Sequence, residues 1–229
     1  MRLVESQQHI ATLSYVDTLE EQALLEELLD EAKPPYPESV QDYHYLLKTP
    51  FRYPPLKWGS RFGKTYEPSL FYAGLNLNTV LAESAYYRFV FWHSMTDKPS
   101  LNFIRTQHTL FSVPYYTDNG IKLQHQPFSR HEALLTDQQN YSNTQILGTQ
   151  MRESGVEGFE YLSARDRFDG ICIGLFTPSV FSQQQPKQSS QWLCELSTDN
   201  VVFKEVGSSK LKEYAIEDFL LDGNLPFPA

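Results

Sequence analysis

Residues 48–64 combine basic and aromatic side chains in a way that suits a small, charged ligand. The stretch contains five basic residues and no acidic one. Phe51, Tyr53, Trp58 and Phe62 are interleaved with these basic residues. Guanidinium groups bind phosphates bidentately, and aromatic rings stack on planar groups. The segment therefore indicates a ligand that carries both phosphates and planar rings, and a dinucleotide fits this description.

Glycine-rich phosphate-binding loops are absent from the sequence, which contains neither G-x-G-x-x-G nor a P-loop. Such loops bind phosphates through backbone N–H groups, so we expect side chains to hold any nucleotide here. A Rossmann oxidoreductase is therefore disfavoured. The six histidines are dispersed, and no pair has zinc-ligand spacing with a third ligand, so we predict no metal site.

Charge and hydropathy exclude several classes of protein. The chain has 229 residues and a formal net charge of −9 at pH 7, and an acidic protein repels the phosphate backbone of nucleic acids. No apolar run is long enough to cross a bilayer, and residues 1–12 lack the apolar core of a signal peptide. We therefore expect a cytoplasmic protein with no direct nucleic-acid or membrane partner. Its two cysteines, Cys172 and Cys194, are expected to be reduced thiols packed in strands.

The elements that must position the 48–64 segment are predicted by hydrophobic periodicity and capping residues. Thr18 and Glu21 have the spacing of a capping box, and the prolines that follow position 33 end the helix. We expect helices over 18–32, 39–48, 79–95 and 144–154, the third capped by Asn78 and the last ended by Gly155. We expect strands over 69–75, 102–113, 156–162, 170–176, 192–196 and 201–206. Short strands mixed with a few helices indicate a compact α+β fold.

Six short blocks occur in an order that resembles a known family. They are Phe51-Arg52-Tyr53, Gly59-Ser60-Arg61-Phe62, Leu70-Phe71-Tyr72-Ala73, Thr79-Val80-Leu81-Ala82-Glu83, Thr144-Gln145-Ile146-Leu147-Gly148 and Gly158-Phe159-Glu160-Tyr161-Leu162-Ser163-Ala164-Arg165. Together they resemble the RES domain, named for its Arg, Glu and Ser, over roughly residues 46–176. RES proteins are toxins of bacterial toxin–antitoxin pairs that degrade NAD⁺. The resemblance implies a fold like that of ADP-ribosyltransferase toxins.

The resemblance also implies roles for the residues that match the family's motifs. Glu83 would stabilise the oxocarbenium-like charge that develops on the ribose as nicotinamide departs. Arg52 would bind the pyrophosphate, and Arg61 would be a second phosphate ligand. Tyr53 and Tyr72 would bracket the nicotinamide or its ribose by stacking.

Ser163 matches the family's serine, and the resemblance implies that it orients Arg52 or the substrate. No His–acid pair is evident beside it, so we do not expect a nucleophilic role. The structural alternative for Glu83 is that a carboxylate near a helix start only opposes the helix dipole. The predicted catalytic residues are Glu83, Arg52 and Tyr53, and the predicted substrate-binding residues are Arg61, Tyr72 and Ser163.

The activity that the resemblance implies is cleavage of the nicotinamide–ribose bond of NAD⁺ by hydrolysis or phosphorolysis. NAD⁺ would be the substrate, no further cofactor would be needed, and an Xre-type antitoxin would restrain the enzyme. The same chemistry would serve an ADP-ribosyltransferase that modifies a macromolecule, and a catalytically silent NAD-binding or interaction module is a third alternative. We expect residues 1–45 to form a helical extension and residues 46–229 to form one compact catalytic domain.

Overall fold

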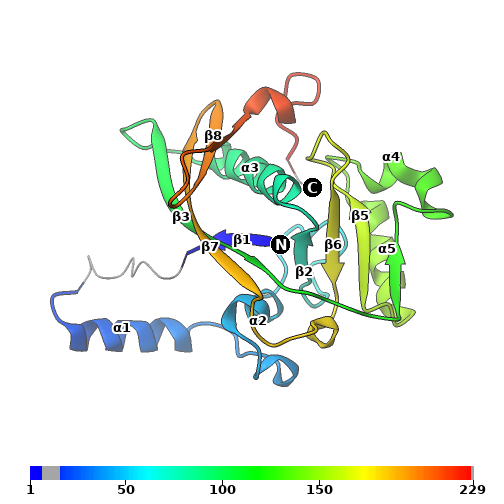
Figure 1. Cartoon of the computed structure of the whole chain (residues 1–229), viewed down its shortest axis with the longest axis horizontal. Coiled ribbons are helices and arrows are strands. Elements are labelled where there is room, and N and C mark those ends of the chain that lie inside the picture. Colours follow the sequence, from blue (N-terminus) through cyan, green and yellow to red (C-terminus); the bar gives the residue numbers. More distant parts are fainter. Residues whose placement is uncertain (7–15, 228–229) are drawn as a thin grey trace.

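The computed structural model describes residues 1–6 and 16–227 (Figure 1). Its α-helices are α1 (Leu19–Glu31), α2 (Tyr45–Arg52), α3 (Leu77–Ser94), α4 (Glu132–Leu135) and α5 (Ser142–Glu153). Its strands are β1 (Arg2–Glu5), β2 (Phe71–Gly74), β3 (Phe103–Ser112), β4 (Gly120–Lys122), β5 (Gly158–Leu162), β6 (Ile171–Leu175), β7 (Gln188–Ser197), β8 (Asn200–Glu205) and β9 (Leu211–Ala215). Short 3₁₀ helices are η2 (Glu38–Val40), η3 (Phe128–His131), η4 (Pro178–Val180) and η5 (Ile216–Phe219).

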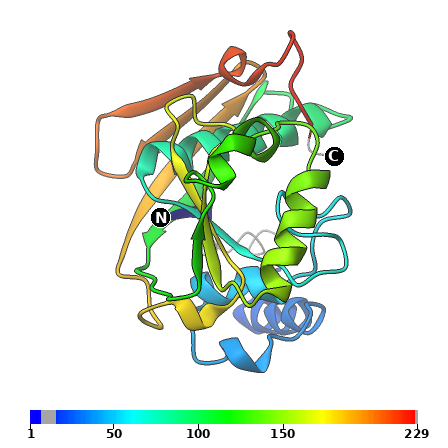
Figure 2. The same ribbon diagram turned by 90° about the vertical axis from the view of Figure 1, so that its right-hand side faces the viewer.

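The strands form two sheets. The first is antiparallel, with five strands in the order β1-β3-β7-β8-β9, and the second has four strands in the order β2-β6-β5-β4. The second sheet is mixed, because β4 pairs with β5 in parallel while its other pairs are antiparallel. Figure 2 shows the orange-to-red strands of the first sheet at the upper left and green α5 at the right. The predicted α+β class is confirmed.

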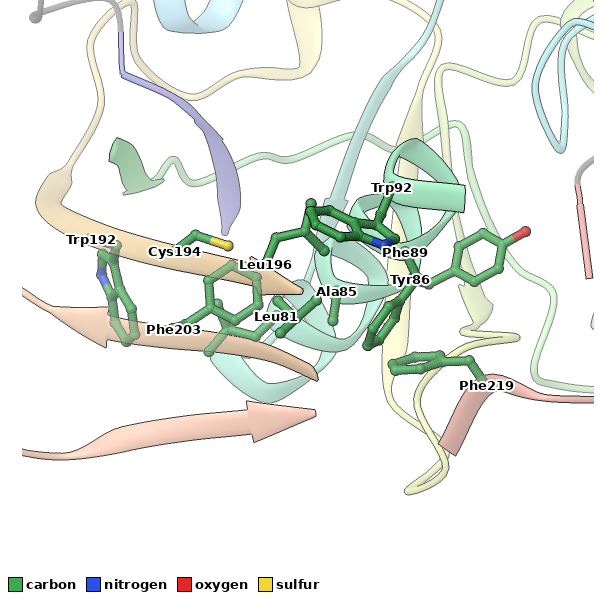
Figure 3. Close-up of a cluster of buried hydrophobic side chains, with 11 residues drawn as sticks. Leu81, Ala85, Tyr86, Phe89, Trp92, Trp192, Cys194, Leu196, Phe203 and Phe219 are labelled. Atoms are coloured by element: carbon green, nitrogen blue, oxygen red, sulfur yellow. The ribbon is translucent and has the colours of Figure 1, made fainter. Parts of the chain in front are cut away.

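Helix α3 lies between the two sheets and packs against strands of both, β1, β7 and β8 on one side and β2 and β6 on the other. Its N-cap is Asn76, whose side chain accepts a hydrogen bond from the Thr79 N–H at 2.9 Å. The predicted cap, Asn78, was therefore wrong by two residues. The helix contributes Leu81, Tyr86 and other apolar residues to the core against the first sheet, which contributes Trp192 and Phe203 to the same cluster (Figure 3).

The second sheet has its own core, which α5 covers. Phe62, Met151 and Phe159 are fully buried there, together with Cys172 of β6. Helix α5 approaches the chain very closely at Gly148, where a Cβ atom would lie 2.0 Å from the Phe62 carbonyl oxygen. Only glycine permits this approach, so Gly148 sets the distance between α5 and the 59–63 loop.

Several predicted elements are displaced, and others were missed. The second helix was expected over 39–48, but residues 38–40 form only a 3₁₀ turn and α2 begins after His44, whose ring accepts a hydrogen bond from the Leu46 N–H. Residues 1–45 were expected to form a helical extension, but Arg2–Glu5 form strand β1, which pairs with β3 at the edge of the five-stranded sheet. Strand β9 was also missed, since its residues are largely exposed and show no alternation of polar and apolar side chains.

Other expectations at the level of single elements are confirmed. Thr18 caps α1, accepting a hydrogen bond from the Glu21 N–H at 3.1 Å. Cys172 in β6 and Cys194 in β7 are buried free thiols. Among the described helices, none combines the length and the apolarity that crossing a membrane would require.

Replacing Gly148 by Ala should destabilise the fold, because the new methyl group would meet the backbone of Phe62 rather than a movable side chain. We expect the free energy of unfolding to fall by about 1–3 kcal/mol, as is typical of overpacked sites. Chemical denaturation would measure the change. Gln150→Ala, at an exposed position of the same helix, should differ little from the wild type and serves as the control. A Gly148→Ala variant as stable as this control would contradict the packing argument.

Candidate functional site

Two adjoining cavities form one two-lobed cleft where the sheets meet. The larger cavity has a volume of about 560 Å³ and is lined by β1, β2, α3 and the 56–61 segment, with Glu83 among its residues; we call it the Glu83 lobe. The smaller, of about 350 Å³, lies beside α2 and the 53–60 segment, and we call it the Tyr53 lobe. Both lobes are lined by Arg2, Glu5, Leu56, Gly59, Ser60 and Tyr72.

The carboxylate of Glu83 is held by one of its two oxygens. The Ser163 hydroxyl donates a hydrogen bond to Glu83 Oε1 at 2.5 Å, and the thiol of Cys172 donates to the same oxygen at 3.7 Å. Burial raises the pKa of the Cys172 thiol well above its ordinary value, so the thiol keeps its proton and can donate. Oε2 makes no hydrogen bond to any residue in the described part of the chain. One oxygen is thus fixed, and the other is free to meet a ligand in the lobe.

Ser163 is a positioning residue in this geometry. Its hydroxyl oxygen accepts hydrogen bonds from the backbone N–H groups of Arg165, at 3.1 Å, and Asp166, at 2.9 Å, while its proton is donated to Glu83. No histidine is among its hydrogen-bond partners within residues 1–6 and 16–227. The side chain therefore connects the turn after β5 to helix α3 and orients the carboxylate.

Tyr72 directs its hydroxyl group to the loop that carries Arg61. The hydroxyl oxygen accepts a hydrogen bond from the Phe62 N–H at 3.0 Å and lies 2.9 Å from Ser60 Oγ. Burial raises the pKa of Tyr72 to about 12, so its hydroxyl is neutral at physiological pH. The same loop is held from α5, where Gln145 donates to the carbonyl oxygens of Trp58 and Ser60. Three of the blocks recognised in the sequence therefore meet at this loop.

Arg61 is buried and lines the Glu83 lobe. Its Nη1 donates to the carbonyl oxygens of Leu135, at 3.2 Å, and Asp137, at 2.8 Å. The guanidinium carbon lies 4.6 Å from the centroid of the Tyr141 ring. One face and one nitrogen of the guanidinium are thus occupied by the protein, and its charge remains near Glu83.

Arg52 and Tyr53 are neighbours in the chain but face different surroundings. Tyr53 is exposed and lines the lobe named after it. The Arg52 guanidinium lines neither lobe: it donates to the Pro34 carbonyl oxygen, pairs with the Asp30 carboxylate at 3.0 Å and lies 4.2 Å from the centroid of the Tyr36 ring. The hydrogen bond from Arg52 holds the pKa of the Asp30 carboxyl below its ordinary value.

The predicted residues therefore divide into two groups. The structure brings Tyr53, Arg61, Tyr72 and Glu83 to the cleft and places Ser163 in direct contact with Glu83. It leaves Arg52 outside, against the end of α1 and the segment that follows it.

Three further arginines, which sequence reasoning did not assign to the site, also line the cleft. Arg165 donates to the Gln138 side chain and backbone carbonyl and stacks over Tyr86, with the guanidinium carbon 3.5 Å from the ring centroid. Arg88 pairs with the Glu5 carboxylate at 2.9 Å. Arg2 lies on β1, a strand of four residues, which is too short for hydrophobic periodicity to reveal. In the described chain, no cluster of His, Cys, Asp or Glu is suited to hold a metal ion.

Replacing Ser163 by Ala should lower stability, because the Arg165 and Asp166 N–H groups lose their acceptor in a buried turn. We expect a loss of about 1–3 kcal/mol in the free energy of unfolding, the range for buried donors left unsatisfied. Urea denaturation would measure it. Ser179→Ala, at the exposed position of the short helix η4, provides the control. Equal stability of the two variants would contradict the anchoring role.

Comparison with known families supports the resemblance that was inferred from the blocks that meet at the cleft. The family model of the RES domain matches residues 36–197. A comparison with curated proteins finds no match. The matched segment covers more than half of the chain and includes every element that lines the cleft except β1. The protein therefore belongs to the RES domain family.

Proposed function

We propose that the protein degrades NAD⁺ by cleaving the bond between nicotinamide and ribose. The observation that carries the proposal is the Glu83 carboxylate, which has one oxygen fixed by Ser163 and the other unpaired among the described residues of the cleft. Membership of the RES family supports the same reaction, because it is the activity that the family resemblance implies.

Cleavage of this bond requires stabilisation of positive charge rather than protonation of a leaving group. As the bond breaks, its electron pair goes to the pyridinium nitrogen, and nicotinamide departs as a neutral molecule. Positive charge then develops on the ribose carbon and ring oxygen, where a nearby carboxylate stabilises it. The free oxygen of Glu83 supplies the negative charge that this stabilisation requires. Water, which loses one proton to the solvent, or inorganic phosphate then bonds to the ribose carbon and completes the reaction.

The size and charge of the cleft also support a dinucleotide substrate. Its lobes of about 560 and 350 Å³ each fall in the range of small-molecule sites, which is about 300–1,000 Å³. Arg61 places a positive charge in the Glu83 lobe, and aromatic residues line both lobes. Such a lining suits a ligand that carries both phosphates and planar rings.

The proposal includes a protein partner, because RES toxins are restrained by antitoxins. An Xre-type antitoxin would prevent NAD⁺ depletion by covering the cleft. The alternative activity, transfer of ADP-ribose to a macromolecule, uses the same carboxylate, so labelling of a lysate with ADP-ribose, rather than the Glu83 variant, distinguishes it.

Replacing Glu83 by Gln should abolish NAD⁺ cleavage, because the amide keeps the shape of the side chain but loses the charge. We expect turnover to fall by at least about 100-fold, the size of effect seen when one charge-stabilising group is removed. Nicotinamide release by purified protein would be measured with and without inorganic phosphate. Glu132→Gln, at an exposed position of α4, is the matched control.

Each outcome of the Glu83 experiment bears on the proposed mechanism. A Glu83→Gln variant that keeps near-wild-type turnover would contradict the mechanism. If the wild type leaves NAD⁺ intact in both conditions, labelling of a lysate with ADP-ribose would indicate a transferase. Stable NAD⁺ binding without labelling would indicate a silent module.

Direct binding of phosphate by Arg52 stays a prediction, and in the described geometry the guanidinium would first have to leave Asp30 and Tyr36. We instead expect Arg52 to act by holding the end of α2, so that Arg52→Ala and Tyr36→Ala have similar effects. Each should raise the KM for NAD⁺ by less than about fivefold, as for an exposed ion pair worth about 0–1 kcal/mol. A rise of tenfold or more in Arg52→Ala alone would restore the direct role.

A further inference from the structure

Arg2 is the cleft arginine that the protein itself leaves least satisfied. Its Nη1 donates to the Tyr72 carbonyl oxygen at 2.7 Å, and its guanidinium carbon lies 5.1 Å from the centroid of the Phe71 ring. Its Nε is buried and has no hydrogen-bond partner within the described residues. No carboxylate of the described chain forms an ion pair with it.

Among the four arginines that line the cleft, only Arg2 has a buried nitrogen without a hydrogen-bond partner within the described residues. Arg88 is neutralised by Glu5, at 2.9 Å. Arg61 and Arg165 donate to backbone or side-chain oxygens and stack on tyrosine rings. A partly buried guanidinium without an anion is costly, and an anionic ligand removes that cost. Burial lowers the pKa of Arg2 to about 10, which leaves the side chain charged at neutral pH.

The position of Arg2 matches the chemistry of a dinucleotide. Arg2 lines both the Glu83 lobe and the Tyr53 lobe, as do Ser60 and Tyr72. It is held at this junction because β1 lies against β2: the Gly74 N–H donates to the Met1 carbonyl oxygen at 2.9 Å. A dinucleotide consists of two nucleosides joined by a diphosphate, so a ligand that fills both lobes must place its phosphates at the junction.

We propose that Arg2 binds the diphosphate of a dinucleotide whose nicotinamide riboside occupies the Glu83 lobe and whose second nucleoside occupies the Tyr53 lobe. This inference rests on the proposed function for the identity of the first nucleoside, since the ribose must face Glu83. In this arrangement Tyr53 stacks on the second base rather than on nicotinamide. The arrangement also predicts that the protein prefers a dinucleotide to nicotinamide mononucleotide, which fills one lobe.

The test uses the full chain, two variants of Arg2 and one control. Arg2→Met removes the charge at similar side-chain length, and Arg2→Lys keeps the charge but loses the planar fork. Arg105→Met removes an arginine that is 72% exposed on β3. Calorimetry would measure the affinities for ADP and adenosine, which differ by the diphosphate, and kinetics would measure the KM for NAD⁺ and for nicotinamide mononucleotide. Thermal unfolding would show which variants are folded.

We expect the wild type and Arg105→Met to bind ADP more tightly than adenosine. Arg2→Met should lose at least about tenfold in ADP affinity, the effect of removing hydrogen bonds to a charged group, and should keep its adenosine affinity. The ADP affinity of Arg2→Lys should lie between those of the wild type and Arg2→Met. The KM should rise more for NAD⁺ than for nicotinamide mononucleotide.

Opposite results separate this inference from the proposed function. A folded Arg2→Met variant with ADP affinity within about twofold of the wild type would overturn the inference, even if NAD⁺ is cleaved. If Arg2→Met does not fold, unchanged ADP affinity in Arg2→Lys, or equal binding of ADP and adenosine by the wild type, overturns it. ADP binding that depends on Arg2 in a protein that leaves NAD⁺ intact supports the Arg2 site and refutes the proposed function.

Discussion

The burial of α3 between two sheets is the constraint on which the candidate site depends. Strands of both sheets pack against this helix, and its apolar residues complete the core of the five-stranded sheet. A helix enclosed in this way cannot rotate without opening a core, because protein interiors are close-packed. Glu83 lies on the face of α3 that lines the cleft, between the buried Ala82 and Ala85. Packing therefore sets the direction of the carboxylate, and Ser163 then fixes one of its oxygens.

The loop of residues 59–63 is positioned by the burial of Phe62 in the core and by a second set of contacts. It is braced by the Tyr72 hydroxyl, by the Gln145 amide and by the close approach of α5 at Gly148. These contacts join the loop to β2, which follows it closely in the sequence, and to α5, which lies far from it. They give a physical reason for the side chains in two of the recognised blocks: the block of residues 70–73 supplies one brace, Tyr72, and the block of residues 144–148 supplies two, Gln145 and Gly148. Arg61 is then carried into the Glu83 lobe by a loop with little freedom to move.

Sequence reasoning succeeded where local pattern determines structure and failed where tertiary pairing decides. Periodicity and capping predicted α1, α3, α5 and most strands, because long amphipathic or buried segments carry a strong signal. They could not reveal β1, whose four residues are recognised only by pairing with β3. Because β1 was not predicted, Arg2 was not assigned to the site, and the pyrophosphate contact was assigned to Arg52 instead. Nothing in the sequence indicates that Arg52 faces Asp30 and Tyr36, since these contacts depend on how the chain returns after the prolines.

The distribution of charge explains how a protein of net charge −9 can present a positively charged cleft. The acidic residues of α1 lie on an exposed helix, of whose residues only Gln22 is buried, and one of these acids, Asp30, pairs with Arg52. Inside the cleft the balance is reversed, because four arginines line it against only Glu5 and Glu83. A cavity lined by one sign of charge concentrates field lines and raises the local concentration of the opposite charge. Since Glu5 is already paired with Arg88, Arg2 carries the positive charge without a carboxylate partner at the junction of the lobes, and in the proposed complex it would attract the phosphates there and leave the free carboxylate oxygen of Glu83 to the ribose.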